Sequence, residues 1–183
     1  LDMALRRALQ AGEFELAFQP IMDAGGESID AVEALLRWND PSRGVVSPGE
    51  FIPVLEQTGL IVPVGQWVLR ESCKRVQSWM AQGALPVTLS VNVSPIQFAE
   101  PDFVRHVLMA LEATGFPARQ LQLEVTEGLL LDPTPGSLRK MDALVDAGVR
   151  LAVDDFGMGY SSLAYLKKFR LHSLKIDRMF VRD

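Results

Sequence analysis

The segment Val149-Arg150-Leu151-Ala152-Val153-Asp154-Asp155-Phe156-Gly157 joins a largely apolar, strand-like run to two adjacent carboxylates. Neighbouring side chains of a strand point to opposite faces, so Asp154 and Asp155 can act together only where the strand ends and the chain turns. Gly157 and Gly159 indicate such a turn. Acidic pairs at strand ends often hold hard divalent cations, although a solvated turn is the alternative for an isolated pair.

Four further strand-like runs carry polar residues of the same kind. An acid inside an apolar strand is destabilising unless it is paired or binds a metal. One shared cation site is therefore the simplest interpretation of all five runs. The four runs are 31–38 with Glu33 and Arg37, 89–94 with Asn92, 121–127 with Glu124 and Glu127, and 173–177 with Lys175 and Asp177.

The composition indicates one globular domain. The chain has 183 residues, of which 48% are hydrophobic and 22% charged, enough for a substantial core. A net charge of −5 argues against a broad basic surface for DNA. The single cysteine, Cys73, allows no intrachain disulfide, which fits a reducing cytoplasm. We interpret Cys73, His106 and His172 as structural.

The order of elements predicts an α/β fold. Strands alternate with helices, which favours a mainly parallel sheet, with functional residues at the carboxyl ends of its strands. The short turn Ala24-Gly25-Gly26-Glu27 favours a hairpin and hence one antiparallel strand. We expect strands at 15–22, 31–38, 87–93, 121–125, 149–154 and 173–176, and helices at 51–57, 64–82, 102–114, 137–147 and 161–168.

Two local features qualify this interpretation. Glu33 lies near the start of its run, which is explained if either the first or the second strand is reversed. Ser47-Pro48-Gly49-Glu50 has the pattern of a helix start, with Ser as the N-cap. No apolar run reaches the roughly 18 residues of a membrane helix, and the start of the chain shows no signal-peptide pattern.

Six short motifs, taken in order, resemble those of EAL domains, bacterial phosphodiesterases of the second messenger cyclic di-GMP. The resemblance implies a modified TIM (β/α)8 barrel with one antiparallel strand, in a single EAL-type domain over residues 1–183. It implies hydrolysis of cyclic di-GMP to linear pGpG, the alternative being a non-catalytic receptor or a regulatory EAL-like module. The motifs are Phe18-Gln19-Pro20, Glu33-Ala34-Leu35, Asn92-Val93-Ser94, Glu124-Val125-Thr126-Glu127, Asp154-Asp155-Phe156-Gly157 and Lys175-Ile176-Asp177.

The same resemblance implies a role for each site residue. Oxygen ligands suit Mg²⁺ or Mn²⁺ in a two-metal site, and Ca²⁺ would bind without supporting activity. The implied ligands are Glu33, Asn92, Glu124 and Asp154 for one cation, and Asp154 and Asp155 for a second. Lys175 would orient or activate the attacking water, and Glu127 would steady the loop after the 149–154 strand. Gln19, Leu35 and Arg37 would contact the dinucleotide, with Arg37 near a phosphate.

The chain departs from the family pattern in two ways. Met158 stands where the family usually has Thr, and the family's later motifs do not occur before the last residue, Asp183. An eight-unit barrel needs about 250 residues, so we expect a barrel truncated after about the sixth strand. Open edges on the first and sixth strands would favour self-association, for example as a homodimer. We expect a cytoplasmic location; sensory or cyclase domains, or a membrane anchor, could belong to a longer parent protein.

Overall fold

The strands form a single sheet. The computed structural model describes residues 1–84, 87–131, 134–157, 169–176 and 178–180. Within them the sheet order is β1-β2-β4-β5-β6-β7, with β3 paired to β2 outside this path. The strands are β1 Phe14–Met22, β2 Ile29–Asp40, β3 Gly44–Val46, β4 Thr88–Val93, β5 Leu121–Thr126, β6 Arg150–Phe156 and β7 Ser173–Ile176.

The orientation of the strands explains the position of Glu33. β1 runs antiparallel to β2, whereas β2, β4, β5, β6 and β7 are mutually parallel, so the first strand is the reversed one. Only Ala31 to Ala34 of the long β2 pair with β4. Glu33 therefore lies near the carboxyl end of the parallel-paired part of β2. The predicted hairpin is confirmed, and the short β3 adds a second antiparallel pairing to β2.

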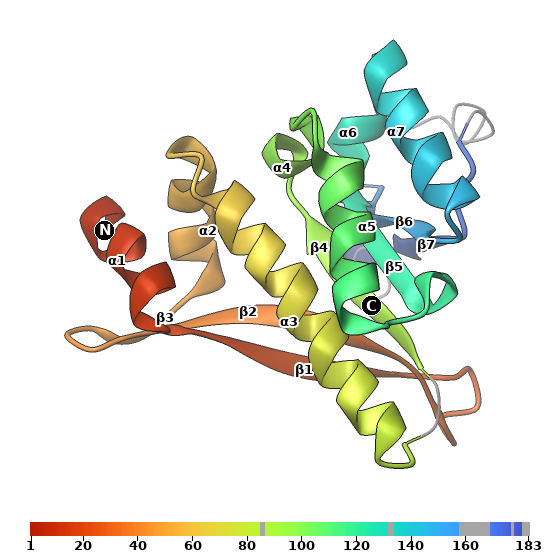
Figure 1. Cartoon of the computed structure of the whole chain (residues 1–183), viewed down its shortest axis with the longest axis horizontal. Helices are drawn as coiled ribbons and strands as arrows, with labels where there is room; N and C mark the ends of the chain where they lie inside the picture. Colours follow the sequence, from red (N-terminus) through yellow and green to blue (C-terminus); the bar gives the residue numbers. More distant parts are fainter. Residues whose placement is uncertain (85–86, 132–133, 158–168, 177, 181–183) are drawn as a thin grey trace.

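Helices cover the sheet and fill the connections between its strands. Figure 1 shows α3 crossing the long β1–β2 hairpin, with α5 beside it and with α6 and α7 grouped near β6. None of the helices described has the length and apolar character that crossing a membrane requires. They are α1 Asp2–Ala11, α2 Pro48–Gln57, α3 Ile61–Ala81, α4 Pro95–Ala99, α5 Phe103–Thr114, α6 Glu127–Leu131 and α7 Pro135–Asp146, with short 3-10 helices η1 Ala118–Gln120 and η2 Arg178–Phe180.

The parallel strands present two different faces. Alternate residues of a strand point to opposite sides. One set, including Leu89, Leu123 and Val153, is fully buried in the main hydrophobic core. The other set carries the polar residues that were singled out in the sequence. The apolar side chains of these strands thus pack in the core, and the polar side chains lie on the opposite face of the sheet.

The expected elements agree with the structure apart from their ends and a few short pieces. The α/β fold is confirmed, whereas the expected helix over 161–168 and Met158 lie outside the described residues. The structure adds four elements that were not expected from the sequence: α1, β3, α4 and α6. Ser47 is the N-cap of α2 as expected, but its side chain makes no capping hydrogen bond there.

Lys140 of α7 supports the short helix α4 from outside. Its Nζ donates to the carbonyl oxygens of Phe98, Ala99 and Glu100 at 2.8, 2.8 and 2.7 Å, where α4 ends. Lys140→Met should lower the free energy of unfolding by about 1–3 kcal/mol, because carbonyl groups at a helix end lose their donor. Urea unfolding measures the change. Arg139→Met, an exposed neighbour, should shift stability by less than about 0.5 kcal/mol, and equal losses in both variants would refute the capping role.

Candidate metal and phosphodiester site

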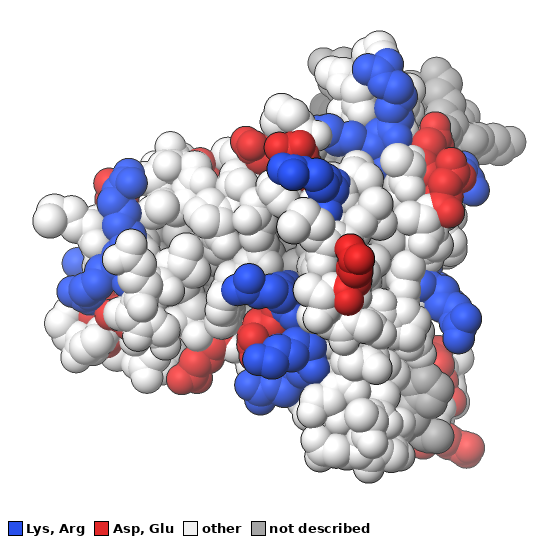
Figure 2. Space-filling view, viewed as in Figure 1, with Lys and Arg blue, Asp and Glu red and all other residues white. Residues whose placement is uncertain are grey.

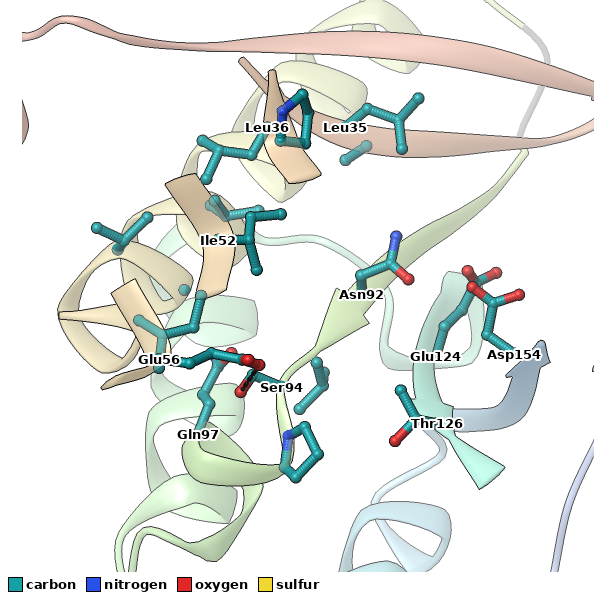
Figure 3. Close-up of a pocket in the computed structure, with 18 of the residues that line it drawn as sticks. Leu35, Leu36, Ile52, Glu56, Asn92, Ser94, Gln97, Glu124, Thr126 and Asp154 are labelled. Atoms are coloured by element: carbon teal, nitrogen blue, oxygen red, sulfur yellow. Dashed lines mark hydrogen bonds between the residues drawn. The ribbon is translucent and has the colours of Figure 1, made fainter. Parts of the chain in front are cut away.

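Five strands bring five of the predicted site residues together. Glu33 lies on β2, Asn92 on β4, Glu124 on β5, Asp154 on β6 and Lys175 on β7. Figure 3 shows the carboxylates of Glu124 and Asp154 side by side, with Asn92 directed toward the same space. Residues up to 142 positions apart in sequence therefore share one small region of the sheet.

Lys175 is the centre of this cluster. Its Nζ donates to Glu124 Oε2 at 2.7 Å and to Glu33 Oε2 at 3.0 Å, and it lies 3.4 Å from Asp154 Oδ1. Its side chain is 30% exposed, whereas that of Glu124 is fully buried. Three carboxylates thus surround one ammonium group in a partly dehydrated place, where charge interactions are strong.

The single positive charge of Lys175 does not balance the carboxylates of this cluster. Burial is the largest influence on Glu124 and raises the pKa of its carboxyl group, while Lys175 and, more weakly, Ser90 act in the opposite direction. Burial opposes the charge of Lys175, but Glu124, Glu33 and Asp154 together outweigh it and raise the pKa of the amine. Lys175 is therefore protonated at neutral pH. One ammonium group cannot neutralise three carboxylates, and this deficit favours a further cation.

Asn92 is oriented by Glu33. Its Nδ2 donates to Glu33 Oε1 at 2.8 Å, so its carbonyl oxygen is the atom left to accept a hydrogen bond or bind a cation. Glu33 in turn receives Asn92 on one oxygen and Lys175 on the other. These contacts fix the rotamers of both side chains.

The chain turns sharply at the end of β6. Asp155 has a φ of 52°, a left-handed conformation that is uncommon outside Gly, Asn and Asp. This turn allows the exposed Asp155 to line the same cavity as Asp154, although neighbours in a strand face opposite ways. The buried Glu127 accepts a hydrogen bond from the backbone N–H of Gly157 at 3.0 Å and so ties this loop to the start of α6.

A cavity of about 390 Å³ opens beside the cluster. Leu35 and Arg37 line it together with Asn92, Glu124, Asp154 and Asp155. Arg37 Nη1 donates to the carbonyl of Leu36 at 2.9 Å. Gln19 does not line the cavity but is the cross-strand partner of Glu33, on the same side of the hairpin. The volume lies in the range of sites for small organic ligands.

Some other residues that line the cavity have no role predicted from the sequence. Ser94 Oγ donates to Glu56 Oε1 at 2.7 Å on one wall of the cavity. Gln97 is 5% exposed and packs so closely on Gly65 that a Cβ there would lie 2.4 Å from Gln97 Oε1. Their contacts join segments far apart in sequence, so no local sequence pattern predicts these contacts. The Ser-Pro pair that starts α4 was the available signal.

The chemistry of the donors fits a divalent cation. Within the described part of the chain, no three His, Cys, Asp or Glu side chains are already spaced as a metal site, since Lys175 lies between the carboxylates. However, Glu124 Oε1 is buried and has no hydrogen-bond partner among the described residues. An orphaned carboxylate oxygen is destabilising unless a cation or a donor satisfies it. The donors are all oxygens, which suits Mg²⁺ or Mn²⁺.

Comparison with protein families decides the relationship. Residues 2–183 match the family model described as the EAL domain. The chain belongs to the EAL domain family. The resemblance read from the six motifs is thereby confirmed, and so is the expected relation of the fold to the EAL barrel.

Several relatives match nearly all of this chain. The "Bifunctional diguanylate cyclase/cyclic di-GMP phosphodiesterase MucR" of Pseudomonas aeruginosa is 41% identical over 179 residues, 98% of this chain and 26% of MucR. An uncharacterised Synechocystis protein is 42% identical over the whole chain, which spans 26% of that protein. The solved structure "PaMucR Phosphodiesterase, c-di-GMP complex" matches with a TM-score of 0.93 and 41% identity, over 98% of this chain and 72% of that one. The chain thus spans about a quarter of these curated relatives.

Proposed function

We propose that this EAL domain hydrolyses cyclic di-GMP to linear pGpG with the help of divalent cations. The observation that carries the proposal is the cluster around Lys175, in which carboxylates from three strands face one ammonium group and Glu124 keeps an orphaned oxygen. A relative of 41% identity was solved as a phosphodiesterase in complex with c-di-GMP. Both point to phosphodiester chemistry at this end of the sheet.

The chain's own residues would divide the work as follows. Glu33, Asn92, Glu124 and Asp154 would hold one Mg²⁺ or Mn²⁺, and Asp154 and Asp155 would hold a second. Such cations, when bound, lower the pKa of water and stabilise the charge that develops on a phosphodiester. Lys175 would orient the attacking water, because its raised pKa keeps it protonated and able to donate hydrogen bonds. Glu127 would hold the Asp155 loop through Gly157.

Recognition of the anionic dinucleotide would depend on few charges. On the face shown in Figure 2, basic side chains stand in separate groups interspersed with acidic ones. Arg37 lines the cavity, and only one of its donors is used by Leu36 in the described structure. Leu35 offers an apolar surface beside it. We infer that Arg37 contacts a phosphate and that the cations supply the remaining positive charge.

Binding of cyclic di-GMP should therefore require both Arg37 and a divalent cation. In Ca²⁺, Arg37→Ala should weaken binding about 10- to 100-fold, the worth of a charge-assisted hydrogen bond. A chelator should weaken the wild type at least as much. Calorimetry of the full-length protein measures both effects, with the exposed Arg43→Ala as the matched control. Undiminished affinity of Arg37→Ala in chelator would count against this arrangement.

Product analysis separates the enzyme from the alternative, a receptor that binds cyclic di-GMP without cleaving it. The full-length protein in Mn²⁺ should convert cyclic di-GMP to linear pGpG, which chromatography resolves from the substrate. Tight binding with no product in either Mg²⁺ or Mn²⁺ would establish the receptor. Retention of all the proposed carboxylate ligands in the described cluster favours the enzyme.

A further inference from the structure

A chain of neutral hydrogen bonds lies next to the charged cluster. Gln122 Nε2 donates to Ser90 Oγ at 3.1 Å, and Ser173 Oγ donates to Gln122 Oε1 at 3.2 Å. Ser90 is completely buried, and Gln122 and Ser173 are half-buried. One amide thus joins side chains from β4 and β7, two strands that are not neighbours in the sheet.

Each member of this polar chain stands two residues before a site residue. Residues two apart on a strand share a face, so each lies directly beneath its site residue on the same side of the sheet. The register agrees, because Ser90 pairs with Gln122 and Asn92 pairs with Glu124. The three pairs are Ser90 and Asn92 on β4, Gln122 and Glu124 on β5, and Ser173 and Lys175 on β7.

The strand between β5 and β7 leaves room for this connection. β6 places Ala152 opposite both Glu124 and Ser173. Ala152 is fully buried and offers only a methyl group. Two side-chain contacts therefore pass over β6 at this level, one from Ser173 to Gln122 and the other from Lys175 to Glu124. The neutral contact and the charged contact both join β5 to β7, at positions two residues apart along each strand.

We propose that Gln122 is a positioning residue for the metal and phosphodiester site. Its planar amide fixes the separation of β4, β5 and β7, and with it the reach of Lys175 to Glu124 and of Asn92 into the cluster. A salt bridge in a dehydrated place depends steeply on distance, so a small change in strand separation would be felt at the site. This inference rests on the proposed function; its kinetic part needs hydrolysis of cyclic di-GMP, whereas its metal-binding part needs only the proposed cation site.

The test compares Gln122→Met, which removes two interstrand hydrogen bonds, with the loss of an interstrand hydrogen bond elsewhere in the sheet. Methionine keeps the length of the side chain but neither donates nor accepts strongly. Thr88→Val removes the hydrogen bond from Arg150 Nη1 to Thr88 Oγ1, 3.2 Å long, which joins β4 and β6 farther from the site. Calorimetric titration of the full-length protein with Mn²⁺ gives the metal affinity, and steady-state kinetics with cyclic di-GMP gives kcat and KM.

Gln122→Met should weaken Mn²⁺ binding about tenfold and lower kcat by a similar factor, with KM changed by less than about twofold. Thr88→Val should leave all three quantities within about twofold of wild type. Ser173→Ala, which breaks only the contact to β7, should cause part of the same loss, whereas Ser173→Thr, which keeps the hydroxyl, should stay near the wild-type values. A double variant of Gln122→Met and Ser173→Ala should be no worse than Gln122→Met alone, because Gln122→Met already breaks the contact that Ser173→Ala removes.

Unchanged Mn²⁺ affinity in Gln122→Met, or an equal loss in Thr88→Val, would overturn the inference. A wild-type protein that binds Mn²⁺ but hydrolyses no cyclic di-GMP would refute the proposed function instead. In that case the Mn²⁺ affinities of the variants still decide the role of Gln122. The two failures are therefore distinguishable in one set of measurements.

Discussion

Glu33→Gln should reduce hydrolysis of cyclic di-GMP by about 1000-fold or more, because the metal contribution to phosphodiester cleavage amounts to several kilocalories per mole. Glu33 is the carboxylate that contacts both Asn92 and Lys175. Glutamine has the same shape and can still accept from Asn92, so the change removes the charge while disturbing the packing little. The loss should therefore fall on metal affinity and turnover.

Release of linear pGpG by the full-length protein at saturating Mn²⁺ measures this effect. Glu112→Gln on α5 is the matched control, since Glu112 is exposed on a helix and is outside the cavity. It should keep wild-type turnover. If Glu33→Gln retained more than about a tenth of wild-type activity, a role of Glu33 in metal binding would be untenable.

Lys175→Met should have two large effects of separate origin. Turnover should fall about 100-fold or more, because the attacking water loses the donor that orients it. Stability should fall by about 3 kcal/mol, because the buried Glu124 loses its partner. Burial already raises the pKa of Glu124, and loss of Lys175 raises it further. The folded variant then binds more protons than the unfolded chain, so its stability falls as the pH rises through the pKa of Glu124 in the folded state.

A second substitution separates the two effects of Lys175→Met. Adding Glu124→Gln removes the buried charge and should restore most of the stability, measured by urea unfolding across a pH series. Turnover should stay low, because neither residue is restored. Recovery of activity in this double variant would contradict both the role of Lys175 in orienting the water and the role of Glu124 as a metal ligand. Normal turnover of Lys175→Met itself would remove the amine from the mechanism.

Much of the fold could be predicted because its signals are local. The strand around Leu89 alternates apolar and polar residues, which indicates a strand with one face in the core. Each acid in an apolar run indicated a side chain on the other face, paired or bound to a metal. Short elements were missed: α4 begins at Ser94-Pro95, directly after a strand, and its five residues are too few to show a helical repeat. The orientation of β1 could not be decided from Glu33, because either reversal explains its position.

The residues of the site could be predicted in part, but their contacts could not. Candidate residues could be named from the sequence, but Lys175 and Glu33 lie 142 residues apart, and only the folded sheet shows which oxygen each contacts. Gln122 gave no signal, because a glutamine in a strand looks like an ordinary solvent-facing residue. Its partners Ser90 and Ser173 are 32 and 51 residues away. The assignment of ligands to two cations stays a prediction for the experiments above.

The left-handed backbone of Asp155 affects how genetic tests of this site should be interpreted. At a φ of 52°, an alanine would strain the backbone by roughly 1–2 kcal/mol, in addition to removing the carboxylate. An alanine scan would therefore overstate the contribution of this carboxylate to chemistry. Asparagine tolerates the same conformation and removes only the charge, and glycine relieves the strain altogether. Among natural variants, Asn or Gly at this position would preserve the shape of the loop while altering its ability to hold a cation.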